Sequence, residues 1–196
     1  MATMHYLLLG IFSVAVLLLG GIDHRAVERE IAEDEPGSMA MGARPWHQDR
    51  RIALRKHIVQ IAAQEIGVRE ATGHNDGTRV EEYLAYTELG KGYAWCAAFV
   101  SWCYGQVGQP APRNAWSPAL FPVARRYTSR QAQQGRIRPA DLFGIYNARL
   151  GRIDHVGIVR EKQGHWILTV EGNVGNRVLS KRRSVVTIHA FSNWLD

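Results

Sequence analysis

The chain has 196 residues, of which 46% are hydrophobic, and its formal net charge is +6. Once an apolar N-terminal segment is subtracted, the remaining length suits one globular domain with a single core. A domain of this size needs no disulfide or metal for stability. The basic charge favours an anionic partner such as nucleic acid, a lipid surface or an acidic polymer. Nucleic acid is disfavoured, because the sequence has no zinc-finger spacing, no basic helix with heptads and no aromatic-basic strand signature.

Residues 6–22 form an almost unbroken apolar run that is rich in Leu and Val. The run is long for the core of a signal peptide and slightly short for a spanning helix, so residues 1–22 are predicted to be an export signal or a membrane anchor. No clear basic stretch precedes the run and no clear Ala-x-Ala pattern follows it, which favours an uncleaved anchor. Acidic and basic residues are mixed after the run, so the membrane orientation stays open.

Residues 23–45 are charged at first and then small and polar, as in Glu33-Asp34-Glu35-Pro36-Gly37-Ser38. Such a segment has little to bury and predicts a flexible linker. The folded domain is therefore placed at residues 46–196.

Three helices are predicted in the first half of the domain. Apolar residues recur at helical spacing between Pro45 and Gly67, and Thr78 is predicted to cap a second helix. A third helix begins near Cys96 and runs toward Val107, because its apolar residues form one stripe before a glycine and a proline end it.

The second half changes to strands, which are predicted at residues 142–146, 155–160 and 166–171 and twice more between Arg177 and Phe191. Helices that precede strands, instead of alternating with them, favour an α+β domain with an antiparallel sheet.

The two cysteines, Cys96 and Cys103, lie on the third predicted helix. Their separation corresponds to about 10.5 Å of helical rise, which is too far for a disulfide, so both thiols are expected to be free. Cys96 stands at the helix N-terminus, where unpaired N–H groups and the helix dipole favour a nucleophilic thiolate. Cys103 lies two turns into the apolar stripe and fits a small buried side chain.

His155 is the best candidate for a general base among the eight histidines, because it opens a predicted strand. If residues 162–164 form a three-residue hairpin loop, Glu161 faces His165 and His155 faces Glu171. Asn173 lies on the same side as Glu171, and a two-residue slip would bring it opposite His155 instead. Either residue is able to orient the imidazole, and the choice between them stays open at this point.

Four blocks of sequence together resemble the CHAP family, the cysteine, histidine-dependent amidohydrolases and peptidases related to NlpC-type and papain-like enzymes. The resemblance covers roughly residue 52 to the C-terminus. The blocks are Gly92-Tyr93-Ala94-Trp95-Cys96-Ala97-Ala98-Phe99-Val100, Pro139-Ala140-Asp141-Leu142-Phe143, Asp154-His155-Val156-Gly157-Ile158-Val159 and Val170-Glu171-Gly172-Asn173.

The resemblance implies a papain-like α+β fold, with N-terminal helices packed on a C-terminal antiparallel sheet. It makes Cys96 the nucleophile, His155 the base, and Glu171 and Asn173 the polar partners of the imidazole. It also implies a peptidoglycan substrate, cleaved at an amide bond either next to muramic acid or within the peptides. Some family members carry an acidic calcium loop before the cysteine, but Lys91 and a glycine stand here, so no metal or other cofactor is expected.

Aromatic residues near the nucleophile are candidates for lining the substrate groove, namely Tyr93, Trp95 and Trp116, although such residues are as often packing. Asp141 is expected to cap a turn. The oxyanion is expected to accept from the backbone N–H of Cys96 and from a second, unidentified group.

The expected protein is a monomeric hydrolase of the cell envelope, on the periplasmic or extracellular side, that reaches a membrane through its N-terminal segment and binds no nucleic acid. There are two alternatives, of which the first uses the same residues and the second keeps only the fold. One is a protease or acyltransferase that acts on proteins, and the other is a non-catalytic, membrane-tethered module that binds the wall.

Overall fold

The computed structural model describes residues 43–196. The predicted anchor at 1–22 and most of the predicted linker at 23–45 lie outside the described residues. The first described element is helix α2 (Ala43–Gln64), which begins three residues before the predicted start of the domain. Among residues 43–196, no helix is both long enough and apolar enough to cross a membrane.

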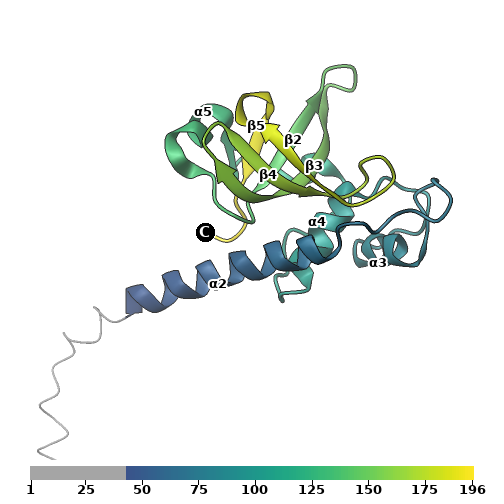
Figure 1. The fold of residues 1–196 in the computed structure, drawn as a ribbon, viewed down its shortest axis with the longest axis horizontal. Coiled ribbons are helices and arrows are strands. Elements are labelled where there is room, and N and C mark those ends of the chain that lie inside the picture. Colours follow the sequence, from purple (N-terminus) through teal and green to yellow (C-terminus); the bar gives the residue numbers. More distant parts are fainter. Residues whose placement is uncertain (1–42) are drawn as a thin grey trace, which may run out of the picture. The chain divides into compact units, whose positions relative to one another are not determined.

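Helix α2 packs on the rest of the domain along one face only. Ile58 and Ala62 are fully buried, whereas residues 47–53 are exposed. Arg55, between these two parts, is buried and donates to the Asp141 carboxylate at 2.8 Å. Figure 1 shows α2 running beneath the sheet, with its C-terminal end close to the other helices.

Helices α3 (Thr78–Tyr86) and α4 (Cys96–Gly105) agree with the second and third predicted helices. The predicted cap of α3 is wrong in detail, because Gly77 is the capping residue and Thr78 is already helical. Every residue of α4 from Cys96 to Tyr104 is buried, so this helix is the centre of the domain and its N-terminus is held firmly.

Six strands form one antiparallel sheet with the order β1-β6-β2-β3-β4-β5. The α+β class and the antiparallel sheet are therefore confirmed, while papain-like packing stays a prediction. The first strand was not predicted, since three residues carry too little periodicity to be recognised. The strands are β1 (Arg126–Thr128), β2 (Leu142–Asn147), β3 (Arg152–Gln163), β4 (Trp166–Glu171), β5 (Leu179–Ser184) and β6 (Ala190–Ser192).

Short helical segments close the remaining surfaces of the sheet. They are the 3₁₀ helices η1 (Ser117–Leu120) and η3 (Val185–Thr187), the single turn α5 (Ser129–Gln131) and the π-helical turn η2 (Ala132–Arg136).

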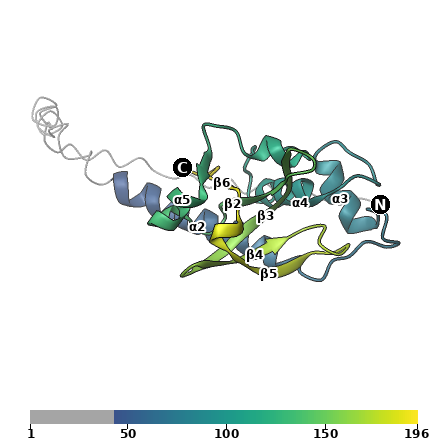
Figure 2. The ribbon, with the colours of Figure 1, turned by 90° about the horizontal axis from the view of Figure 1, so that it is seen from above.

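The sheet has a buried cluster on each face. The larger cluster joins the helices to one face, with Phe99 and Val100 of α4 packed among strand residues such as Val156 and Val170. The smaller cluster lies on the other face and includes Phe143 and residues of η2 and η3. The view from above in Figure 2 shows α4 beside β3 and α3 further out, beyond one end of the sheet. This two-sided burial fixes the register of the central strands, and through them the position of the site.

Candidate active site

Cys96 is the first residue of α4 and is only 5% exposed. The residue before it, Trp95, is fully buried and donates its indole N–H to Glu70 at 2.9 Å. A Cβ on Gly172 would lie 2.8 Å from both Trp95 and Phe99, so only glycine lets the helix start this close to the end of β4. These contacts hold the thiol in one place.

The sulfur atom of Cys96 has polar neighbours from two further segments. The Ser117 hydroxyl, at the start of η1, lies 3.4 Å from Sγ, and the backbone carbonyl of Asp154 lies 4.0 Å away. The His155 side chain and the Val156 backbone N–H are also close enough to lower the pKa of the thiol. The helix N-terminus, η1 and β3 therefore meet at this one atom.

The far side of the imidazole meets a carboxylate. His155 Nε2 lies 2.8 Å from Glu171 Oε2, which leaves Nδ1 as the ring nitrogen on the cysteine side. Glu171 has no exposed surface and also accepts from Thr169 at 2.5 Å and from Arg183 at 2.5 and 2.6 Å. Thiol, imidazole and carboxylate thus form one chain of contacts from α4 through β3 to β4.

The hairpin that brings His155 and Glu171 together differs from the predicted one. The loop has two residues, Gly164 and His165, because Gln163 pairs with Trp166 and Glu161 with Leu168. The predicted pairing of Glu161 with His165 is therefore wrong. A two-residue loop alone would put Glu171 and His155 on opposite faces of the sheet.

A β-bulge corrects the register. The pairing shifts by one residue between Val159 and Glu161, so Arg160 has no opposite partner. Beyond the bulge, Ile158 pairs with Val170, and Gly157 is therefore the residue opposite Glu171. A Cβ on Gly157 would lie 2.9 Å from Glu171 Cγ, which agrees with this register.

His155 reaches Glu171 diagonally, two residues along the strand from the directly opposite position. Gly157 makes this diagonal contact possible, because it leaves the space between the two side chains open. The same space admits Phe143, whose ring would lie 2.6 Å from a Cβ on Gly157 and which meets the imidazole edge-on at 6.2 Å between ring centres.

Charge in the site favours the ionised pair. Burial alone raises the pKa of the Cys96 thiol, but the hydrogen bond and charge of His155, together with Ser117, bring that pKa below its ordinary value. Burial lowers the pKa of His155, whereas Cys96 and Glu171 more than offset it and raise the pKa to about 9. Burial raises the pKa of Glu171, but Arg183, His155 and Thr169 lower it to about 2. The pair is thus poised as thiolate and imidazolium.

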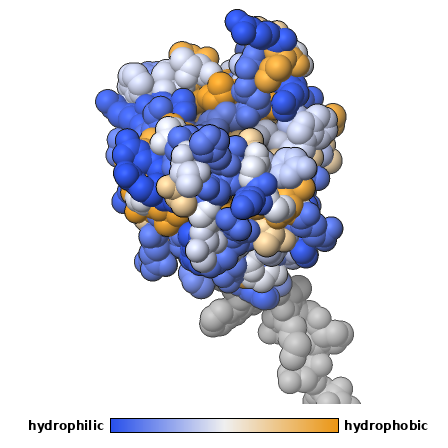
Figure 3. Space-filling model, turned by 90° about the vertical axis from the view of Figure 1, so that its right-hand side faces the viewer, coloured by the Kyte–Doolittle hydropathy of each residue, from blue (hydrophilic) through white to orange (hydrophobic). Residues whose placement is uncertain are grey.

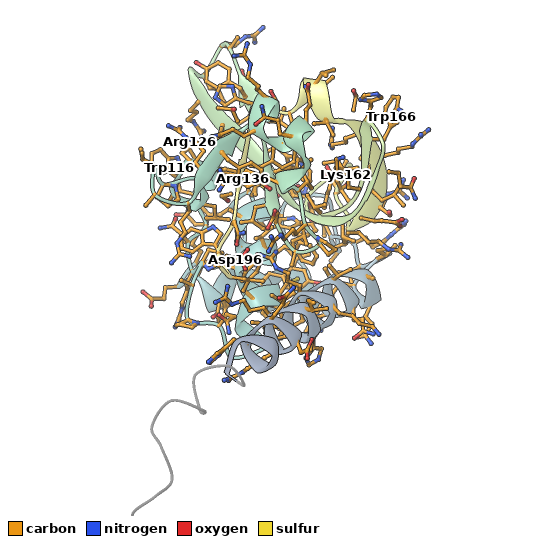
Figure 4. The ribbon with its side chains drawn as sticks, turned by 90° about the vertical axis from the view of Figure 1, so that its left-hand side faces the viewer. Trp116, Arg126, Arg136, Lys162, Trp166 and Asp196 are labelled. Carbon is orange, nitrogen blue, oxygen red and sulfur yellow. The ribbon has the colours of Figure 1, made fainter. Side chains whose placement is uncertain are left out.

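The other predicted site residues have different surroundings. Asn173 donates to the side chain of Asn75 at 3.3 Å, and among residues 43–196 it makes no hydrogen bond to His155. Trp95 is excluded from a substrate groove because none of its surface is exposed. Tyr93 and Trp116 are 58% and 57% exposed and remain available to a ligand. Figure 4 shows Trp116 on the opposite side of the molecule from Trp166, another exposed tryptophan.

Three polar residues around the site were not predicted: Ser117, Thr169 and Arg183. Thr169 and Arg183 lie on the Glu171 face of their strands, since Thr169 is two residues from Glu171 and Arg183 pairs with Ile167. Extending the strand alternation to β5 would have found both residues. No pattern in the sequence points to Ser117, because η1 joins the site only through tertiary packing.

Cys103 has the surroundings that were predicted for it. Both cysteines are free, and Cys103 is fully buried. Burial raises its pKa well above the usual value for a thiol. Asp141 also caps a turn as expected, since its carboxylate accepts from the Arg138 backbone N–H at 3.0 Å.

No group of three or more His, Cys, Asp and Glu side chains within the described part of the chain has the arrangement of a metal site. The expectation that no metal is bound stays a prediction.

A thiol at a helix N-terminus, an imidazole and a carboxylate in contact define the type of site found in cysteine hydrolases. Residues 88–173 match the family model of the CHAP domain, which confirms the resemblance that the sequence blocks suggested. CHAP domains are generally hydrolases, and this match supports activity of the peptidoglycan hydrolase or amidase type. No curated protein and no solved structure matches the chain.

Proposed function

We propose that the chain is a cysteine-dependent peptidoglycan hydrolase that cleaves an amide bond through a thioester on Cys96. The observation that carries this proposal is the 2.8 Å contact of His155 with Glu171 on a strand whose Asp154 carbonyl lies 4.0 Å from Cys96 Sγ, where the imidazole also lowers the pKa of the thiol. A buried, unreactive cysteine would need no imidazole, and within the described residues no histidine acts on Cys103 of the same helix, whose pKa is raised by burial.

The reaction has two steps. The Cys96 thiolate attacks the carbonyl carbon of the amide, and the imidazolium of His155 gives its proton to the amine as the C–N bond breaks. Water then attacks the thioester while His155 accepts a proton from it, and the C–S bond breaks to release the carboxylic acid. The thiolate and imidazolium are restored.

The oxyanion that forms in each step needs hydrogen-bond donors. The backbone N–H of Cys96 stands at the unpaired end of α4 and is one donor. The Ser117 hydroxyl, 3.4 Å from the sulfur, is the candidate for the second. It stabilises the thiolate before attack and turns to the oxyanion afterwards.

The substrate meets the site beside exposed aromatic side chains. Tyr93 precedes the nucleophile by three residues and Trp116 precedes Ser117 directly, so both flank the sulfur along the chain. Their exposed rings offer flat surfaces for sugar or peptide groups. The face of the molecule in Figure 3 is mostly hydrophilic with small separate apolar patches.

The proposed location is the cell envelope, where the substrate is found. Residues 1–22, which lie outside the described residues, are proposed to be the export signal or anchor that delivers the domain there.

The test is digestion of purified sacculi by the full chain, followed by mass spectrometry of the released fragments. We expect the wild type and Cys103→Ala to release the same fragments, and Cys96→Ala and His155→Asn to release none. The mass of the fragments identifies the bond that is cut.

Two other outcomes would reject the proposal. Equal release by wild type and Cys96→Ala would mean that the thiol is not the nucleophile. Intact sacculi combined with Cys96-dependent cleavage of a protein such as casein would mean that the same site acts on proteins.

A further inference from the structure

Arg183 of β5 holds the buried carboxylate of the candidate site by both of its oxygens. Its Nε donates to Glu171 Oε1 at 2.6 Å and its Nη2 donates to Oε2 at 2.5 Å. The Arg183 side chain is 21% exposed and the Glu171 side chain is not exposed at all. Paired, parallel hydrogen bonds of this kind fix both the plane and the position of a carboxylate.

We propose that Arg183 is a positioning residue for the Cys96 and His155 pair, acting through Glu171. It fixes the carboxylate at the one orientation that meets the imidazole and balances its buried charge. This inference rests on the proposed function and adds a fourth residue to the site.

The hydrogen bonds of Glu171 leave it no freedom to turn. Oε1 accepts from Arg183 and from Thr169, and Oε2 accepts from Arg183 and from His155. Each oxygen thus has two donors, which matches its two lone pairs. Since Oε2 meets Nε2 of His155, the ring is held with Nδ1 toward the thiol.

The charges of the four residues sum to zero. The active form has a thiolate on Cys96, an imidazolium on His155, a carboxylate on Glu171 and a guanidinium on Arg183. Without the guanidinium the site would hold a net negative charge, and burial makes that costly enough that a proton would be taken up. Arg183 therefore permits the carboxylate and the thiolate to exist together.

The remaining charged group beside the imidazole is engaged elsewhere. Asp154 precedes His155 in β3, and its carboxylate accepts from the Asn147 side chain at 2.5 Å. The groups that face Glu171 in the described structure are thus His155 from β3, Thr169 from its own strand and Arg183 from β5.

Arg183 lies outside the CHAP match, which ends at residue 173. Its side chain also packs over the Phe143 ring, with the guanidinium carbon 5.4 Å from the ring centre, and Phe143 in turn meets His155 edge-on. Arg183 is therefore linked to the imidazole by a second, apolar route.

The experiment compares Arg183→Gln, Arg183→Lys and the control Arg182→Gln in the full chain. Arg182 is the next residue of β5, is exposed, and stacks on Trp166 instead of touching Glu171. For each variant we would measure the melting temperature, the pH dependence of Cys96 alkylation by iodoacetamide, and kcat and KM on wall fragments.

Removal of a positive charge raises the pKa of every nearby acid, so Arg183→Gln should shift both limbs of the alkylation profile upward by roughly one pH unit. Arg183→Lys keeps the charge and loses the paired geometry, so its profile should stay near that of the wild type. In both variants kcat should fall by about 10- to 100-fold with a smaller change in KM. Arg182→Gln should match the wild type throughout.

Failure of the role proposed for Arg183 and failure of the proposed function would give different results. A folded Arg183→Gln protein with the wild-type pH profile and kcat would overturn the role of Arg183. If Arg183→Gln does not fold, a wild-type kcat in Arg183→Lys would overturn it equally. A wild-type Cys96 that is alkylated only at the pH of an ordinary thiol would instead reject the ion pair on which the proposed function depends.

Discussion

The Glu171 carboxylate has no exposed surface. Its donors are His155, Thr169 and Arg183, which come from three different strands of the sheet. A buried charge persists only when its hydrogen-bonding capacity is filled. The strict burial of Glu171 explains why the imidazole beside it is held so firmly. It also predicts how the site responds to pH.

The proposed thiolate and imidazolium pair exists between the pKa of Cys96 and the pKa of His155, and both pKa values are displaced from their ordinary values. The pKa of the Cys96 thiol is lowered and the pKa of His155 is raised to about 9, so the thiolate and imidazolium coexist from below the usual thiol range up to about pH 9. Glu171, with a pKa of about 2, stays ionised throughout that range.

We therefore expect a bell-shaped dependence of kcat/KM on pH, with activity lost above about pH 9 as His155 gives up its proton.

His155→Gln should move alkylation of Cys96 to higher pH, because burial then acts on the thiol without a compensating charge. An alkylation profile of His155→Gln that equals the wild-type profile would contradict the ion pair.

Gly157 tests the diagonal contact between His155 and Glu171. A Cβ there would lie 2.6 Å from the Phe143 ring and 2.9 Å from Glu171 Cγ. We expect Gly157→Ala to lower the free energy of unfolding by about 1–3 kcal/mol, as overpacking does, and to reduce kcat.

Gly90→Ala is the matched control for that substitution, since no atom lies within 4 Å of an added Cβ and the backbone is not left-handed there. Chemical denaturation and the sacculus assay would measure both variants. An active, fully stable Gly157→Ala protein would show that Phe143 and Glu171 are free to move away from the added Cβ.

At the scale of elements, the site depends on how three pieces meet. The N-terminus of α4 supplies the thiol, β3 the imidazole and β4 the carboxylate, while η1 adds the Ser117 hydroxyl. The bulge in β3 puts the imidazole and the carboxylate on one face of the sheet. The helices and most strands were predictable because their periodicity is local, but the bulge was not, since an extra residue in a strand leaves no local signature.

Helix α2 is attached to the sheet by a buried ion pair. Arg55 donates to Asp141 at 2.8 Å and to the Pro139 carbonyl at 2.8 Å, and it also meets Asp196 at 3.0 Å. Figure 4 shows Asp196 beside α2. These contacts therefore join α2 to the residues just before β2 and to Asp196.

Removing one member of a buried ion pair leaves the other uncompensated. We expect Arg55→Met to lower the free energy of unfolding by about 3–5 kcal/mol in urea denaturation. Arg51→Met is the control, because Arg51 is exposed and lies 3.8 Å from Asp196, and it should change stability by less than about 1 kcal/mol. Equal effects of the two substitutions would show that burial adds nothing to the Arg55 contact.

At the scale of the whole molecule, the formal net charge of +6 bears on the encounter with the substrate. A charge of this sign attracts an acidic wall polymer over about 10 Å at 0.1 M salt and over only about 3 Å at 1 M salt. The same charge favours solubility and has no part in selecting the fold.

We expect binding of Cys96→Ala to sacculi to weaken as salt is raised, as measured by co-sedimentation. The variant is used because it should bind without digesting the wall. Binding that does not respond to salt would mean that aromatic and hydrogen-bonding contacts, such as those available to Tyr93 and Trp116, dominate.

The amino-acid sequence by itself determined the α+β class, the helix that begins at Cys96, two free thiols and the four blocks that match the CHAP domain. These features depend on periodicity and on residues that are close in the chain. Tertiary structure alone decided that Glu171 meets His155 across a bulged hairpin, that Trp95 is buried, and that Ser117 and Arg183 join the site. The physical reason is that strand register and helix packing are set by burial on both faces of the sheet, which is a property of the whole domain and not of any segment.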